Sequence, residues 1–216
     1  MNARNVLARL LAGAVLAVGL GAGAPSRAET AAVEGFRSAQ FGMTEDQVKQ
    51  AIAADFKIQP RAVLKQVNKV DRTTILSVRV ADLLPESGTA QVNYKLGYKT
   101  KKLIQVDVIW SPAVDPKVTP ATLTAILINL RQYLQERGFA KEKTVVNAST
   151  PQPNILLMFR AQDEKDRVVA LLGQFKFDPK AEKEKQLKTD EPVAVIVSYV
   201  LDPKAPDIFK IEKGKF

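Results

Sequence analysis

The sequence predicts an α+β fold in which two helix-plus-antiparallel-sheet units share a core. Two segments carry a helix-start signal followed by apolar residues at helical spacing, and each precedes runs in which apolar and polar residues alternate. This order, a helix and then about four strands, occurs twice, which is typical of a tandem repeat. We expect residues 1–28 to be a signal peptide, 29–112 the first unit, and 113–216 the second unit with a basic C-terminal tail. Sequence identities between the units are few, so the duplication stays open.

The first 28 residues have the pattern of a secretory signal peptide. Arg4 and Arg9 precede an uninterrupted apolar and small run from Leu10 to Ala24, and Ala28 ends a small-residue cleavage pattern. The run is shorter than the roughly 20 strongly apolar residues that a bilayer span needs, so an uncleaved anchor is the weaker alternative. We expect cleavage after Ala28, a mature chain that is periplasmic or secreted and freely soluble, and no membrane-spanning segment after cleavage.

The chain has a basic excess. Its formal net charge is +9, and it falls to +6 after cleavage because three arginines and no acids leave with the signal. In an exported protein this charge favours contact with anionic lipid headgroups, lipopolysaccharide, cell-wall polymer or an acidic protein surface over nucleic acid. The alternative is a charge that serves solubility only. With no cysteine in the sequence, burial alone must hold the core.

The first unit begins with a short helix and continues into strands. Thr44 is placed to cap the helix, with Gln47 completing a capping box, and the apolar stripe ends near Asp55. From Arg61 to Trp110 the apolar residues alternate with polar ones, which predicts several antiparallel strands with one dry face and one wet face.

The second unit begins with a longer helix. Thr119 precedes Pro120 at the first helical position, and Gly138 marks the end. We expect its apolar stripe to pack on the sheet. Later segments predict strands near Thr144–Asn147, Asn154–Ala161, Arg167–Phe177 and Pro192–Leu201, the last placed centrally because it is apolar on both faces. The polar composition of the segment Asp178–Glu191 predicts a solvated loop.

Several classes of catalytic chemistry are excluded by composition. The chain has no histidine and no cysteine, so a serine–histidine–aspartate triad, a thiol nucleophile and a structural zinc site cannot be built. A carboxylate pair, a serine–lysine dyad or an activated tyrosine remains. Asp163, Glu164 and Asp166 cluster at a predicted hairpin tip, where acids are ordinary turn residues. We expect no catalytic residue, no metal site and no cofactor.

One hairpin is a candidate binding site because it combines lysines with aromatic residues. Four lysines fall within eight residues without an acid, and three aromatic side chains lie on or near the same hairpin. These seven candidates are Lys95, Lys99, Lys101, Lys102, Tyr94, Tyr98 and Trp110. The functional interpretation is an anionic-surface site whose aromatics lie against lipid headgroups or sugar rings. The structural interpretation is a charged hairpin that prevents edge pairing, with its aromatics turned inward.

The stretch Phe41-Gly42-Met43-Thr44-x-x-x-Val48 resembles the opening of small bacterial envelope domains of the BamE/SmpA-like and beta-lactamase-inhibitor-like kind. Such domains begin with Gly-Met-Ser/Thr before a helix and continue into a small antiparallel sheet. The inhibitor fold is a tandem of two such units. The outer-membrane-assembly members are lipoproteins, whereas this chain has no cysteine to carry a lipid. The resemblance implies a binding or assembly role and carries over no site residue beyond the helix start.

These observations favour an exported, noncatalytic binding or accessory protein. We expect it to recognise a protein partner or an anionic envelope component through one exposed sheet face. The alternative is a periplasmic hydrolase with a carboxylate or serine–lysine site. A deep pocket with converging Asp, Glu or Lys would favour the enzyme, and an open sheet with exposed Tyr or Trp would favour the binding protein.

Overall fold

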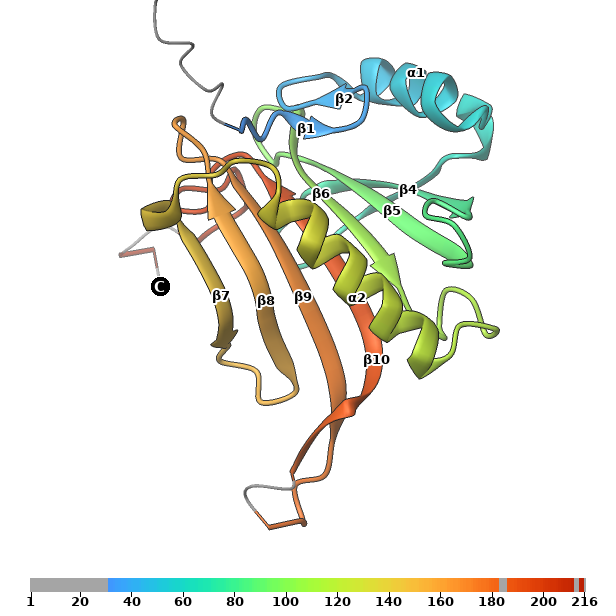
Figure 1. Ribbon diagram of the computed structural model, residues 1–216. Helices are drawn as coiled ribbons and strands as arrows, with labels where there is room; N and C mark the ends of the chain where they lie inside the picture. The colour runs from blue at the N-terminus through green and yellow to red at the C-terminus, as the bar shows by residue number, and fades with distance from the viewer. Residues whose placement is uncertain (1–30, 183–185, 212–213, 216) are drawn as a thin grey trace, which may run out of the picture.

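A computed structural model describes residues 31–182, 186–211 and 214–215 of the chain, and the predicted signal peptide lies outside these ranges. The described residues form an eight-stranded antiparallel sheet, a small two-stranded sheet and two α-helices (Figure 1). The prediction of an α+β fold with antiparallel sheet is therefore confirmed. Neither helix in the described ranges is long and apolar enough to cross a bilayer.

The first half of the chain contains a small hairpin, a helix and four strands. Thr44 caps the helix as predicted: its side chain accepts from the Gln47 backbone, and the Gln47 side chain accepts from the Thr44 backbone. The elements are β1 (Gly35–Phe36), β2 (Ala39–Gln40), α1 (Glu45–Phe56), the 3-10 turn η1 (Pro60–Ala62), β3 (Leu64–Val67), β4 (Thr74–Ala81), β5 (Thr89–Leu96) and β6 (Leu103–Trp110).

The second half repeats the order of one helix and four strands. The Thr119 side chain accepts from the Thr122 backbone, and Pro120 occupies the first turn, where its missing N–H costs nothing. The elements are α2 (Pro120–Gln135), the 3-10 turn η2 (Lys141–Lys143), β7 (Thr144–Ser149), β8 (Ile155–Gln162), β9 (Val168–Phe177) and β10 (Leu187–Val200).

The large sheet has the strand order β3-β4-β5-β6-β10-β9-β8-β7. Each half therefore contributes a meander of four neighbouring strands, and the two meanders join where β6 pairs antiparallel with β10. Val197 of β10 lies between Val108 of β6 and Leu171 of β9, so the predicted central position of this strand is confirmed. The element order occurs twice, while common ancestry of the halves stays a prediction.

Both helices lie on one face of the large sheet. Val106, Val108 and Trp110 point to this face and are buried, and one apolar core joins them to both helices. Leu127 of α2 approaches β9 at Gly173, where an added Cβ would lie 3.4 Å from a Leu127 methyl carbon. The predicted α2 stripe is confirmed, since four of its members are buried and one is partly buried: Leu123, Ile126, Leu127, Leu134 and Leu130.

The predicted loop over Asp178–Glu191 is wrong in part. Strand β10 begins at Leu187, which pairs with Phe177, so β9 and β10 continue as a ribbon beyond the other strands (Figure 1). This ribbon forms without an apolar face because backbone hydrogen bonds hold its two strands together. Its polar side chains stay in water, and Lys176 and Glu191 form an ion pair at 2.8 Å. The pairing register shifts on both sides of Pro192, which has no N–H for the ladder. Residues 183–185 of the predicted loop lie outside the described ranges.

Candidate functional site

The basic turn between β5 and β6 is fastened by a carboxylate of the protein itself. Asp207, from the segment after β10, accepts hydrogen bonds from the backbone N–H groups of Lys99 at 2.9 Å and Thr100 at 2.8 Å, and from the Thr100 hydroxyl at 2.7 Å. Burial pushes the pKa of Asp207 up, but the hydrogen bonds from Thr100 and Lys99 outweigh it and lower the pKa. Because these donors are already used, the turn offers an external anion only its exposed ammonium groups, those of Lys99, Lys101 and Lys102.

Two further candidates, Tyr98 and Lys95, make contacts within the protein. The Tyr98 ring packs edge-on against Phe209 with ring centroids 5.5 Å apart, and the Lys101 ammonium lies 5.3 Å from the Tyr98 centroid. Lys95 lies on β5 with its ammonium 3.7 Å from a carboxylate oxygen of Asp71. These side chains therefore have structural partners.

Tyr94 and Trp110 point to the face of the sheet that the helices cover and lie in the core, with exposed fractions of 0% and 2%. The Tyr94 hydroxyl and the Trp110 indole nitrogen have no hydrogen-bond partner among the described residues. The seven candidates therefore do not form one surface. The structural interpretation of the hairpin expected its aromatics to turn inward, which is right for these two. Edge protection is wrong, because β5 and β6 are interior strands.

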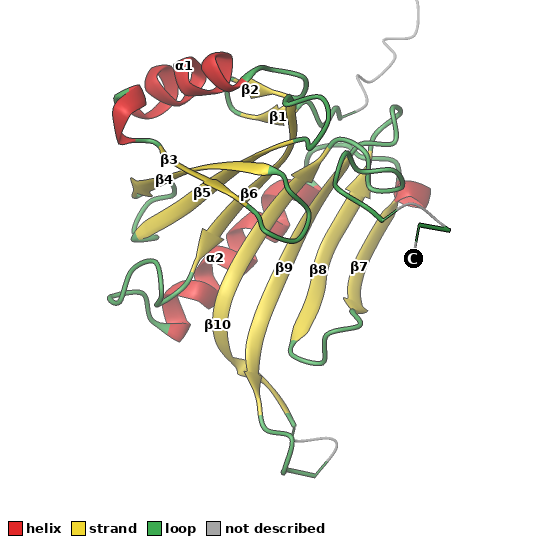
Figure 2. Ribbon diagram, turned by 180° about the vertical axis from the view of Figure 1, so that it is seen from behind, coloured by secondary structure: helices red, strands yellow, loops and turns green. Residues whose placement is uncertain are grey.

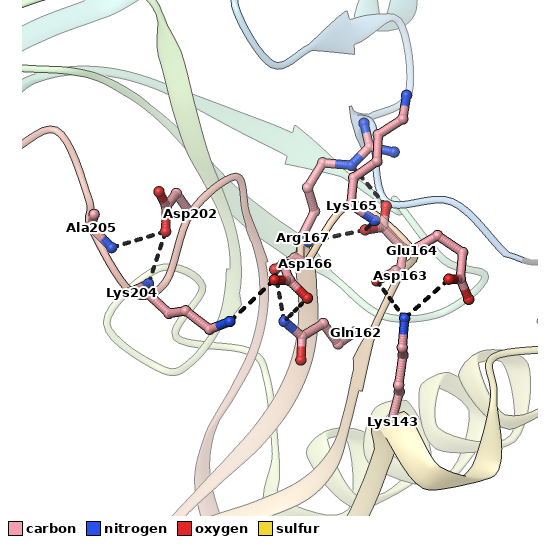
Figure 3. A network of polar contacts seen from close by, with 10 residues as sticks. All are labelled: Lys143, Gln162, Asp163, Glu164, Lys165, Asp166, Arg167, Asp202, Lys204 and Ala205. Carbon is pink, nitrogen blue, oxygen red and sulfur yellow. Dashed lines mark hydrogen bonds and ion pairs between the residues drawn. The ribbon is translucent and has the colours of Figure 1, made fainter.

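The predicted acidic cluster is a structural junction (Figure 3). Asp163 is buried and accepts hydrogen bonds from the backbone N–H groups of Val33, Lys165 and Arg167, each at 2.9 Å, and from the Arg167 guanidinium at 2.7 Å. Burial pushes the pKa of Asp163 up, but the hydrogen bonds from Val33 and Arg167 lower it overall. Its description as an ordinary turn acid is therefore incomplete, because Asp163 ties the N-terminal segment to the β8–β9 hairpin.

Its two neighbours in the cluster are exposed. Glu164 pairs with Lys143 at 3.2 Å, and Asp166 pairs with Lys204 at 3.1 Å. Each of the three acids therefore faces a cation or a backbone N–H. This arrangement suits a structural role and does not bring two carboxylates together around a reacting atom.

On the face of the large sheet opposite the helices, no helix of the described residues covers the central strands, and we call this the uncovered face (Figure 2). A row of apolar side chains crosses four strands on this face, each paired with the next in register. This apolar row is Ile109 of β6, Ile196 of β10, Leu172 of β9 and Leu157 of β8. All four are half-buried, although they lie in the middle of the sheet.

A polar row runs beside the apolar row. It pairs Ser77, Asn93, Asp107 and Ser198 in register across β4, β5, β6 and β10. The Ser77 hydroxyl donates to Asn93 at 2.7 Å, and the Ser198 hydroxyl donates to Asp107 at 2.6 Å. These bonds fix the side chains in place, so the face presents ordered polar groups next to apolar ones.

A cavity of about 840 Å³ lies on the other face, between the sheet, α2 and the N-terminal segment. Its charged lining residues are Glu34, Arg37 and Arg137, and its lining contains no Asp, Lys or Ser. Burial, reinforced by the nearby Tyr133, raises the pKa of the Tyr199 hydroxyl in this cavity to about 12. A carboxylate pair, a serine–lysine dyad and an activated tyrosine are therefore not assembled there. Across the described ranges, no group of three or more acidic, His or Cys residues is placed to hold a metal ion.

Comparison of the chain with protein-family models, with curated proteins and with solved structures finds no match. The function must therefore be inferred from the residues of this chain. The sequence signal for the uncovered face was that the β10 segment is apolar on both faces, which predicted a central strand. One of those two apolar faces is the side without helices, where Ile196 lies.

Proposed function

We propose that this protein is an exported, noncatalytic binding or accessory protein that recognises a protein partner through the uncovered face of its large sheet. The observation that carries the proposal is the apolar row, Ile109, Ile196, Leu172 and Leu157, on a sheet face that neither described helix covers. Contiguous apolar surface that remains accessible marks interaction sites. Export is inferred from the signal-peptide pattern of the first 28 residues.

The composition of this face favours a protein partner. Protein–protein interfaces combine an apolar centre with hydrogen-bonding groups around it, and charged residues are depleted at the centre. The apolar row supplies such a centre, and the polar row supplies fixed acceptors, including the Asp107 carboxylate. Arg79 and Arg160 flank these rows on the same face. The face therefore carries charge of both signs, which suits a mixed protein surface better than a uniformly anionic polymer.

The basic turn supports a second candidate function, contact with an anionic envelope component such as a lipid headgroup, lipopolysaccharide or cell-wall polymer. Its three exposed lysines lie together at one end of the sheet. Their attraction to an anionic surface would be electrostatic and weakened by salt. This contact would be compatible with a protein bound at the uncovered face.

The hydrolase alternative finds less support. The cavity lacks the converging acids or lysine that it requires, and the predicted acidic cluster is committed to structural hydrogen bonds. Buried tyrosines with raised pKa values stay protonated at neutral pH, so they do not act as bases.

Affinity capture from an envelope extract tests the proposal. Leu172→Arg places a charge in the centre of the apolar row, while Ile128→Arg places the same charge on the outer side of α2, where Ile128 is 60% exposed. We expect wild type and Ile128→Arg to retain the same specific partner and Leu172→Arg to lose it, with all three melting alike. Equal capture by Leu172→Arg would remove the uncovered face as the binding site.

A further inference from the structure

The cavity between α2 and the sheet is lined by apolar and aromatic side chains together with several polar ones. Its floor is the helix-side surface of the central strands, including Val108, Trp110 and Val197, and α2 contributes Leu130 and Leu134 to its wall. The segment before β1, the β1–β2 hairpin and the β4–β5 loop complete the lining. A volume of about 840 Å³ lies in the range of cavities that enclose small-molecule ligands.

Two arginines supply the positive charge of the rim, and both are exposed. Arg137 donates to the Tyr133 hydroxyl at 3.0 Å and to the Ala32 carbonyl at 3.4 Å. Arg37 lies at the turn of the β1–β2 hairpin with a φ of 53°, a left-handed conformation uncommon for a residue with a side chain. Within the described ranges, neither guanidinium forms an ion pair with a carboxylate. Each therefore has N–H donors available for an anion.

The single acid of the lining, Glu34, makes a long contact with Arg167. A Glu34 carboxylate oxygen lies 3.9 Å from the Arg167 guanidinium, which is itself bound to Asp163. The Tyr199 ring, 5.6 Å from the Phe36 ring, adds an apolar surface and a neutral hydroxyl. The cavity thus combines apolar and aromatic lining groups with two arginines and one acid, so the charge of its lining is positive on balance.

We propose that this cavity binds a single-chain amphiphile, with the acyl chain against Phe36, Leu130 and the Tyr199 ring and the anionic head at Arg37 and Arg137. An apolar chain gains by leaving water, and guanidinium groups form charge-assisted hydrogen bonds with carboxylate or phosphate. A fatty acid and a lysophospholipid share this chemistry. The site lies on the opposite side of the sheet from the uncovered face, so the inference does not depend on the proposed protein partner.

Trp110 provides a direct readout, because it is the only tryptophan of the chain and lines the cavity. Bromine quenches indole emission on close approach, so ω-bromoundecanoate titrated into the purified protein should quench Trp110 in a saturable way. The uncharged ω-bromoundecanol has the same chain and should bind at least about tenfold more weakly, since it cannot form charge-assisted bonds. Saturable quenching that is absent, or equally tight for the alcohol, would overturn the proposal.

A matched pair of variants tests the head site. The double change Arg37→Gln with Arg137→Gln should weaken ω-bromoundecanoate binding about tenfold or more. Arg131→Gln, on α2 but outside the cavity lining, should leave it unchanged. Equal binding by the double variant and wild type would show that these arginines do not hold the head. Because both arginines are exposed, the double variant should keep the wild-type melting temperature.

Competition identifies the source of the anion. Displacement of the brominated probe by laurate but not by lysophosphatidate assigns a fatty acid, and the reverse assigns a phosphate headgroup. Failure of both to displace the probe contradicts a physiological amphiphile site. The Leu172→Arg variant should bind the probe like wild type, so loss of a protein partner and loss of the amphiphile can be told apart.

Discussion

Replacing Asp163 by alanine should destabilise the protein more than any other change in the acidic cluster. The Asp163 side chain is 3% exposed and the Arg167 side chain 11% exposed, with their nitrogen and oxygen 2.7 Å apart. Removal of one partner of a buried ion pair costs about 3–5 kcal/mol, because the other charge stays buried. The backbone N–H groups of Val33, Lys165 and Arg167 would lose their acceptor as well. For a domain of this size we expect the melting temperature to fall by about 6–20 °C.

Thermal and urea unfolding followed by circular dichroism measure this effect, with Glu164→Ala as the control. The Glu164 side chain is 65% exposed and pairs with Lys143 at 3.2 Å, so its loss should cost about 1 kcal/mol or less. A melting temperature of Asp163→Ala within the range of the control would refute a structural role for this carboxylate.

The Asp163→Ala variant should also change how the free energy of unfolding depends on pH. Hydrogen bonds from Val33 and Arg167 outweigh the effect of burial and hold the pKa of Asp163 below its unfolded value. A carboxylate with a lowered folded pKa stabilises the protein fully above the unfolded pKa, about 3.9, and the effect is lost as the pH falls through the folded pKa. The stability difference between wild type and Asp163→Ala should therefore be constant from about pH 7 to 5 and shrink below about pH 4. A difference that does not change with pH would contradict this assignment.

Three further predictions concern the core, the basic turn and the export signal. Leu127→Asp should unfold the domain because it buries an unpaired carboxylate, whereas Ile128→Asp should melt within a few degrees of wild type; equal melting would place Leu127 at the surface. Replacing Lys99, Lys101 and Lys102 by Gln should weaken binding to anionic vesicles about a hundredfold at low salt with little change in melting, and undiminished binding would move that contact elsewhere. Mass spectrometry of the exported protein should find the first 28 residues removed, and a retained Met1 in the membrane pellet would contradict cleavage.

Local chemistry made most helices and strands predictable from sequence. The capping box at Thr44 and the Thr119-Pro120 start depend on neighbouring residues only, so both helices begin where predicted. Alternation placed β4, β5 and β6 within a few residues of their ends. The ribbon at the start of β10 was missed because its polar residues show no alternation, and its strands are held by backbone pairing.

Contacts between distant residues explain what the sequence did not predict. Alternation put Tyr94 with Val92 and Leu96 on the dry face, a pattern that favours burial, but only the fold shows which face the helices cover. The hydrogen bonds that Lys99 donates to Asp207 and Val33 donates to Asp163 join residues more than 100 positions apart. Sequence periodicity does not indicate such pairs, so neither of these long-range contacts could be predicted.

The cavity is also a product of long-range packing. Its lining brings the N-terminal segment and the β1–β2 hairpin to α2 and to the strands of both halves. Arg37 and Arg137 are separated along the chain by most of the first sheet unit, and neither stands in a recognisable motif. No sequence pattern therefore connects these two arginines.

Site-specific photocross-linking in intact cells tests whether the uncovered sheet face binds a protein. A photoreactive amino acid at Leu172 samples the middle of the apolar row, and the same group at Ile128 samples the outer side of α2. We expect a discrete cross-linked product from position 172, suppressed by excess purified wild-type protein, and none from position 128. A product from position 128 alone, or no product from either position, would contradict this expectation.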